Sequence, residues 1–185
     1  IQCRYPSLRD PQQLGRLVSS TLASQRGRPF GLGWSAGFDT RLEVHGDGTV
    51  QVIPGDGHPY SYEPGVGLGE FDSPPGIFND LRETTEGYEE RDPTGGIRFF
   101  NETGVLQATE NRFGHRSDLF YDSCWQLEQF TDRFGRLYFI TWTPDERYIS
   151  KITDFAGREV DYNYDLVNGL LIGVVGASTD NPADP

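Results

Sequence analysis

The chain of 185 residues has no methionine, a single lysine, two cysteines and no long apolar run. A membrane-spanning helix needs about 18 or more consecutive apolar residues, so the sequence predicts no membrane span. A sequence that begins at Ile1 without methionine is expected to be a fragment or a processed product. Cys3 and Cys124 leave two alternatives open, a disulfide in an oxidising compartment or two buried thiols.

Residues typical of catalytic or metal sites are also scarce. The three histidines (His45, His58 and His115) lie in predicted turns and show no ligand spacing. No Gly-x-Ser-x-Gly elbow, Walker loop or dinucleotide-binding motif is present. Paired carboxylates such as Asp161 and Asp165 suit glycosidase chemistry, but a predicted strand favours solvent-facing or turn-forming roles for them. The sequence therefore predicts no catalytic residue, no metal site and no cofactor.

Charge is unevenly distributed. The whole chain carries −12, and residues 1–38 carry five arginines against one aspartate, which makes +4 there and −16 in the remainder. Such an acidic surface repels phosphate backbones, so nucleic acid is not expected as a partner. The basic start is expected to dock on the acidic remainder or on an acidic neighbour in a longer chain; simple solvation of its arginines is the alternative.

Turn residues and short alternating segments predict a mainly β fold. Glycine (23) and proline (12) are abundant. Asp47-Gly48 and Asp56-Gly57 predict tight hairpin turns, because glycine readily adopts the positive φ that such turns need. The only helix that the sequence predicts covers residues 11–18, with Asp10 as N-cap and Pro11 at the first position, and it passes into a strand at 19–24.

The segment 64–96 is the least regular part of the sequence. Its proline and glycine predict loops, and the residues expected to contact the core are Ile77, Phe78, Leu81 and Tyr88. Its clustered acids are expected to form a solvated face, because no histidine accompanies them; they are Glu83, Glu86, Glu89, Glu90 and Asp92.

Beyond residue 97 the chain repeats itself every 21 or 22 residues. Asn111, Asp132 and Asp154 are each followed at a fixed offset by a glycine, namely Gly114, Gly135 and Gly157. Equivalent apolar positions are Leu106, Leu127, Ile149 and Leu171. A fixed period in this range is typical of repeat architectures. The sequence therefore predicts consecutive antiparallel hairpins in one sheet over 97–175, with the apolar positions stacked on one side and neighbouring units burying one another.

The last unit resembles a YD repeat of the RHS (rearrangement hot spot) family. That pattern runs from an aspartate through Gly-Arg and a short strand to Tyr-Asp, then Gly and a hydrophobe. Its matches here are Asp154, Gly157, Arg158, Tyr162, Tyr164, Asp165, Asn168, Gly169 and Leu170. The preceding unit keeps Asp132, Gly135 and Arg136 but has Trp142 and Thr143 in the place of Tyr-Asp, and the unit before that has Tyr121-Asp122.

A second resemblance covers residues 29–64, which are similar to the entry of an RHS shell. The Gly-x-Gly-Trp motif of that region is matched by Gly31, Gly33 and Trp34. Because two glycines permit a sharp bend and tryptophan has a large area to bury, this motif is expected to seat the N-terminal segment against the first strands of the shell, with Trp34 as a buried anchor.

The resemblance implies four regions: a basic segment at 1–28, a shell-entry β region with an acidic loop at 29–96, three to four YD-like repeats at 97–175, and a tail at 176–185. It also implies a segment of a larger β-shell that encapsulates or presents a toxic or effector domain, as in polymorphic toxins, insecticidal toxin complexes and teneurins. Such a scaffold has no chemistry of its own and is secreted or on the cell surface. Its partner is the rest of a longer chain or an associated fragment.

Two further expectations concern exposed surfaces. The apolar strand at 168–175 is expected to pair with another chain or to be covered by the next repeat. The alternative function is an extracellular adhesive module that uses aromatic faces to bind sugars or another protein, although aromatics at strand spacing favour core positions.

Overall fold

The computed structural model describes residues 29–55, 58–123 and 125–176, and these residues form antiparallel strands joined by short loops. A short 3-10 turn, η2 (Gly37–Asp39), precedes the first strand. The strands are β1 (Arg41–Val44), β2 (Val50–Ile53), β3 (Tyr60–Pro64), β4 (Phe71–Asp72), β5 (Asp80–Thr84), β6 (Gly87–Arg91), β7 (Ile97–Phe100), β8 (Leu106–Glu110), β9 (Arg116–Tyr121), β10 (Leu127–Thr131), β11 (Leu137–Trp142), β12 (Ile149–Thr153), β13 (Glu159–Asp165) and β14 (Leu170–Val175).

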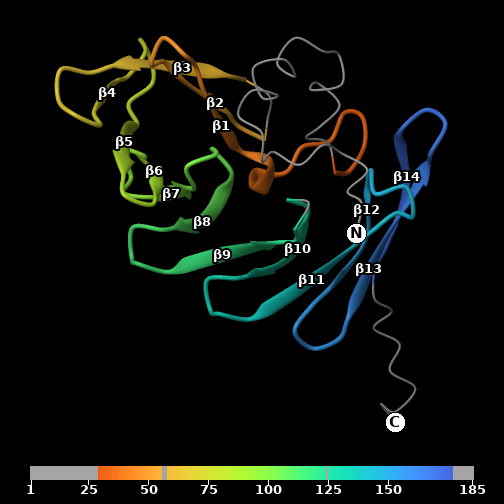
Figure 1. Cartoon of the computed structure of the whole chain (residues 1–185). Coiled ribbons are helices and arrows are strands. Elements are labelled where there is room, and N and C mark those ends of the chain that lie inside the picture. Colours follow the sequence, from red (N-terminus) through yellow and green to blue (C-terminus); the bar gives the residue numbers. More distant parts are fainter. Residues whose placement is uncertain (1–28, 56–57, 124, 177–185) are drawn as a thin grey trace.

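The strands form a four-stranded sheet, β1 to β4, and a ten-stranded sheet, β5 to β14, in which each strand pairs with its neighbours in sequence (Figure 1). The two sheets meet where Glu70 bridges to Arg82 and the Glu83 N–H donates to the carbonyl of Gly69 at 2.8 Å. The prediction of a mainly β fold made of consecutive antiparallel hairpins is confirmed.

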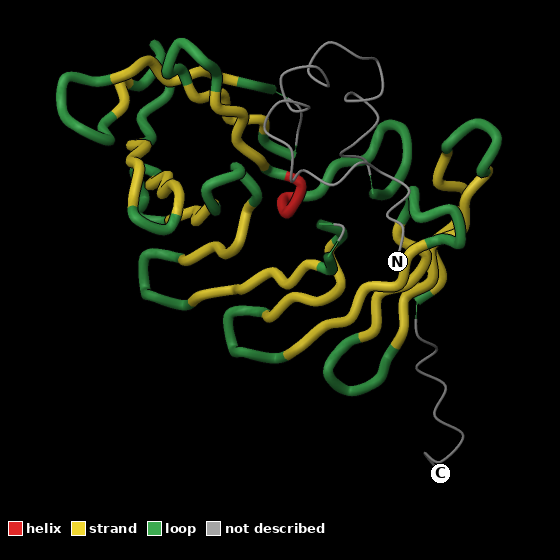
Figure 2. Tube along the Cα trace, viewed as in Figure 1, coloured by secondary structure: helices red, strands yellow, loops and turns green. Residues whose placement is uncertain are grey.

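The ten-stranded sheet is strongly curled, as the Cα trace shows (Figure 2). Its pairing register shifts in four strand pairs: at Phe99/Phe100 between β7 and β8, at Leu127/Gln129 between β9 and β10, at Thr141/Trp142 between β11 and β12, and at Asn163/Tyr164 between β13 and β14. Each shift places an extra residue on one strand, which bends that strand and increases its twist. These irregularities recur near the same end of successive strand pairs. Their bends therefore add up and coil the sheet.

Among the described residues, one hydrophobic core joins both sheets. Its buried members are Leu42, Val50, Val52, Tyr62, Leu81, Tyr88, Phe100, Leu106, Leu119, Leu127, Ile140 and Ile149. The predicted stack is confirmed for Leu106, Leu127 and Ile149, which are 1%, 4% and 0% exposed. Leu171 is only half-buried, because β14 is an edge strand of the ten-stranded sheet.

The segment 64–96 differs from its expected loop structure, since it contains β4, β5 and β6. Glycine and proline cluster at the ends of these strands, so their density obscures the alternation within them. Leu81 and Tyr88 are buried as predicted, and Ile77 packs against the core. Phe78 is 81% exposed, so its predicted core contact is wrong.

The predicted turn at Asp47-Gly48 is present, with Gly48 at a φ of 90°. Several other expectations fall outside the described residues: the helix at 11–18, the strand at 19–24, the pairing of Cys3 with Cys124, and the turn at Asp56-Gly57. None of the helices that the structure describes is long and apolar enough to cross a membrane.

Candidate functional site

One loop design recurs along the ten-stranded sheet, and it uses the aspartates and glycines that the repeat pattern singled out. In the Asp132 loop, the aspartate N–H donates to the Arg136 carbonyl at 3.0 Å, and the Gly135 N–H donates to the Asp132 carbonyl at 2.8 Å. The Asp132 Oδ1 accepts the N–H groups of Phe134 and Arg136 at 2.9 and 3.1 Å. The side chain thus satisfies loop donors that would otherwise need water.

The same backbone pattern occurs in the loops that begin at Asp92, Asn101, Asn111, Asp122, Asp132 and Asp154. In each, the fourth residue has a left-handed backbone, which Gly157 adopts at 80° and which Trp125 adopts at 63° despite its side chain. The repeat of 21 or 22 residues did not predict the loops at Asp92 and Asn101. Their signal is visible in the letters, because both read as Asp or Asn followed three residues later by glycine.

Two of these loops carry an added ion pair. Arg136 donates through Nε to the Asp132 Oδ2 at 2.7 Å, and Arg158 donates in the same way to Asp154 at 2.7 Å. The Arg136 hydrogen bond holds the pKa of Asp132 below its usual range. Partial desolvation opposes ionisation of Asp154, but hydrogen bonds from the Arg158 backbone and side chain still keep its pKa below the usual range. Both carboxylates therefore favour folding at neutral pH. This contribution is lost as the pH falls from the ordinary pKa of an aspartate through the lowered pKa of the folded state.

The Tyr-Asp position has a different role, which the sequence pattern did not reveal. The Tyr121 hydroxyl donates to the Leu106 carbonyl at 2.7 Å, and the Tyr164 hydroxyl donates to the Ile149 carbonyl at 2.7 Å. In the intermediate unit, the Trp142 indole N–H donates to the Leu127 carbonyl at 2.8 Å. Each of these contacts, here called a clasp, joins the two strands of one hairpin at the end away from its loop: β8 with β9, β10 with β11, and β12 with β13. Trp142 therefore preserves the contact although it departs from the Tyr-Asp pattern.

Asp165 follows the last clasp and starts the β13–β14 loop. Its Oδ1 accepts the N–H of Val167 at 3.0 Å, and its Oδ2 accepts the side-chain amide of Asn168 at 2.6 Å. The Asn168 side chain is the main cause of a lowered pKa at Asp165. The Gly169 N–H then donates to the Asp165 carbonyl at 2.8 Å and completes the loop.

The entry motif docks on the last hairpins rather than on the first strands. The Pro29 carbonyl accepts the Ile149 N–H at 2.7 Å, and the Leu32 N–H donates to the Gly169 carbonyl at 2.8 Å. A Cβ at Gly31 would lie 2.6 Å from the same Gly169 oxygen, so this close approach requires glycine. Gly33 has a φ of 84° but open space around it.

The prediction that Trp34 is a buried anchor is wrong, since 54% of its surface is exposed. Phe30 takes that place: it is half-buried, and its ring centroid lies 4.9 Å from that of Tyr162 and 6.2 Å from that of Phe38. Ring size favoured Trp34 in the sequence, but the bend at Gly31 turns the chain outward just after Phe30.

The hairpin loops lie on two rims of the sheet. One rim, here called the docked rim, consists of the loops at 101–105, 122–126, 143–148 and 165–169. The entry motif contacts this rim, and so does β1, whose Leu42 N–H donates to the Gly104 carbonyl at 2.8 Å. The open rim consists of the loops at 92–96, 111–115, 132–136 and 154–158.

A buried acid lies where the two sheets meet. Glu90, predicted to be solvated, is 1% exposed. Its Oε1 accepts the hydroxyls of Tyr60 and Tyr62 at 2.6 and 2.9 Å and the Asn79 amide at 2.9 Å, and its Oε2 lies 3.3 Å from Nε of Arg98. The pKa of Tyr60 is raised, mainly by desolvation and next by the hydrogen bond to Glu90. The Tyr60 hydroxyl therefore stays protonated in this cluster. Asp92 is also not simply solvated, because it forms an open-rim loop.

Asp39 is a second partly buried acid. Its Oδ2 is buried and has no hydrogen-bond partner among the residues that the structure describes. Burial raises the pKa of Asp39 to about 7, and the charge of Arg41 opposes this shift. An unpaired carboxyl in such surroundings is more stable with its proton bound.

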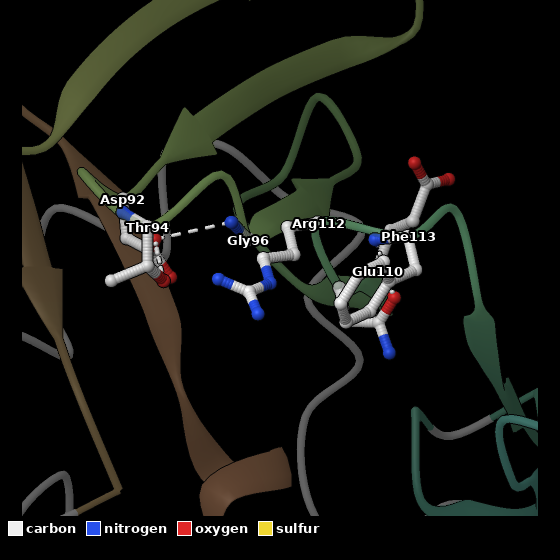
Figure 3. A pocket seen from close by; sticks show the side chains of 7 residues that line it. Asp92, Thr94, Gly96, Glu110, Arg112 and Phe113 are labelled. Carbon is white, nitrogen blue, oxygen red and sulfur yellow. Dashed lines mark hydrogen bonds between the residues drawn. The ribbon is translucent and has the colours of Figure 1, made fainter.

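A depression lies on the open rim, between its first two loops (Figure 3). It has a volume of about 410 Å³ and is lined by Asp92, Thr94, Gly96, Glu110, Asn111, Arg112 and Phe113. In Figure 3 the Arg112 side chain lies between the Asp92 loop and Phe113. Within the described residues, no group of three or more His, Cys, Asp or Glu side chains is placed to hold a metal ion.

No protein-family model matches the sequence, and a comparison with curated proteins finds no significant match. The family resemblance therefore rests on the sequence motifs alone.

Proposed function

We propose that this chain is a wall segment of an RHS-type β-shell, which encapsulates or presents a toxic or effector domain and has no chemistry of its own. The observation that supports this proposal best is the recurrence of the clasp in three successive hairpins. Tyr121, Trp142 and Tyr164 make the same contact at the same sequence distance of 15 residues. A device that repeats in this way suits an array that extends and curves by adding hairpins.

The free edge of β14 fits the same role. Leu170, Ile172 and Val174 are 44%, 68% and 54% exposed, and β14 pairs with β13 alone among the described strands. An apolar edge with unpaired backbone groups favours the addition of another strand. We propose that the next hairpin of a longer chain, or an associated fragment, covers this edge, and that the assembly is secreted or at the cell surface.

The proposal is tested on the native polypeptide, captured with an antibody raised against residues 97–175. Its mass, its associated fragments and its digestion by trypsin are then measured. We expect additional polypeptide, covalent or associated, that resists trypsin until the shell is unfolded. A captured chain that carries no further polypeptide, or whose further polypeptide is digested at once, would contradict enclosure.

The exposed aromatic side chains keep the adhesive module as a second candidate. Trp34 and Phe113 are 54% and 69% exposed, and exposed aromatic rings are common in sugar and protein recognition. Specific binding on a glycan array that is lost in Trp34→Ala would favour this alternative over the scaffold.

A further inference from the structure

Two adjacent loops of the open rim carry the same exposed Arg-Phe pair. The sequence reads Asn-Arg-Phe-Gly at 111–114 and Asp-Arg-Phe-Gly at 132–135. Phe113 and Phe134 are 69% and 62% exposed. The guanidinium carbon of Arg112 lies 4.6 Å from the centroid of Phe113, and that of Arg133 lies 4.7 Å from the centroid of Phe134.

The loop design does not require phenylalanine at this position. Equivalent positions in two other loops hold Thr94 and Thr103, whose hydroxyls donate to the loop side chains of Asp92 and Asn101 at 2.6 and 2.8 Å. Threonine therefore supports the loop, whereas an exposed ring such as Phe113 contributes little to it. Large apolar side chains that are exposed next to each other mark interaction surfaces more often than folding requirements.

The pairs form a row along the rim. Neighbouring loops of one rim are two strands apart, which corresponds to about 10 Å. The row continues at Arg136, whose guanidinium carbon lies 5.2 Å from the centroid of Phe134 and 4.5 Å from that of Phe155. The depression of about 410 Å³ beside Arg112 lies at the other end of this row.

The stacked guanidinium groups favour acidic partners. A guanidinium that lies over a ring still presents its N–H edge to a carboxylate. Arg112 and Arg133 form no ion pair within the described part of the chain, whereas Arg136 is paired with Asp132. Arginine and aromatic residues are also the side chains that contribute most to binding at protein interfaces.

We propose that the open rim binds an extended acidic segment of another protein, with apolar side chains against Phe113 and Phe134 and carboxylates against Arg112 and Arg133. A segment in the extended polyproline II conformation advances about 3.1 Å per residue with three residues per turn, so carboxylates three residues apart lie on one face and match the spacing of the loops. A short segment lies within about one Debye length of the arginines and avoids most of the acidic surface. A long polyanion extends beyond this distance and is repelled by the net charge of −12. This binding role is independent of the scaffold function.

The experiment uses the whole chain of 185 residues and a fluorescent peptide that has aspartate at every third position, each followed by leucine. We expect fluorescence anisotropy to show saturable binding that weakens as salt is added. Phe113→Thr with Phe134→Thr is expected to lower the affinity about tenfold or more, and Arg112→Gln with Arg133→Gln to do the same. Because threonine occupies the equivalent loop positions, the melting temperature of the Phe→Thr variant is expected to stay that of the wild type.

A matched control is Phe78→Thr, which removes a ring that is 81% exposed in the loop before β5 rather than on the open rim. This variant is expected to bind like the wild type, and a peptide with asparagine in place of aspartate is expected to bind at least about tenfold more weakly. Equal affinity for the two peptides, or unchanged affinity of the Phe113→Thr, Phe134→Thr variant, would overturn the proposal. The proposal would also be overturned if the wild type bound a single-stranded oligonucleotide as tightly as the peptide and the same variant abolished that binding. Loss of self-association in sedimentation by this variant would overturn it as well.

Discussion

The clasps yield the sharpest stability prediction, because three donors in different units make one and the same contact. Tyr121→Phe and Tyr164→Phe each remove a single hydroxyl and leave the ring in place. Each variant leaves a partly buried carbonyl, that of Leu106 or Ile149, without this donor. The loss of one such hydrogen bond costs about 1 kcal/mol of unfolding free energy. For a chain of this length that corresponds to a fall of roughly 2–4 °C in melting temperature.

Trp142 provides the complementary test. Trp142→Tyr retains a donor of the kind that the neighbouring units use, whereas Trp142→Phe has none. We expect Trp142→Phe to be less stable than Trp142→Tyr by about 1 kcal/mol, because only the tyrosine hydroxyl can reach the Leu127 carbonyl. The double variant Tyr121→Phe, Tyr164→Phe is expected to show the sum of the two single losses, since the sites share no partner.

Urea denaturation followed by circular dichroism measures these differences. Tyr138→Phe is the matched control, because the Tyr138 ring stacks on Phe130 and its hydroxyl forms no hydrogen bond within the described residues. We expect this control to stay within about 0.5 kcal/mol of the wild type. The clasp reasoning is refuted if Tyr121→Phe and Tyr164→Phe lose no more stability than the control, or if Trp142→Phe equals Trp142→Tyr.

Three other predictions use the buried acids and the free edge. Glu90→Ala leaves Arg98 and two tyrosine hydroxyls without their partner, so chemical denaturation is expected to show a loss of about 3 kcal/mol; a loss below 1 kcal/mol would contradict the buried cluster. The folded state keeps a proton on Asp39, with its pKa at about 7, after the unfolded chain has released it, so Asp39 reduces stability as the pH rises from about 4 to 7. Asp39→Asn is therefore expected to raise the melting temperature at pH 8 and not at pH 4, and the same change at both values would refute the assignment. Ile172→Lys places a charge on the exposed β14 edge and is expected to make the isolated chain more monomeric in sedimentation, whereas identical profiles would count against pairing through this edge.

The sequence was sufficient for those features whose causes lie within a few neighbouring residues. The loop at 132–136 needs only an aspartate, a glycine and the N–H groups between them, so its letters predict its structure. The period of these loops then predicts consecutive hairpins, and the apolar positions between them predict the buried stack of Leu106, Leu127 and Ile149. The resemblance in the last unit likewise selected Tyr164, which makes a clasp.

The tertiary structure alone decided the contacts between residues far apart in the chain. Glu90 reads as one of several surface acids, and only the approach of β3 to β6 surrounds it with two tyrosine hydroxyls. Trp34 reads as the natural anchor of the entry motif, but the close packing of Gly31 on Gly169 directs Phe30 inward and leaves the tryptophan outside. Trp142 reads as a break in the repeat, yet the pairing of β11 with β10 brings its indole N–H to the carbonyl of Leu127. For Glu90 and Trp34, burial depends on which distant strands and loops meet, and no local pattern in the sequence encodes that meeting. For Trp142, the hairpin was predictable but the direction of the indole N–H was not.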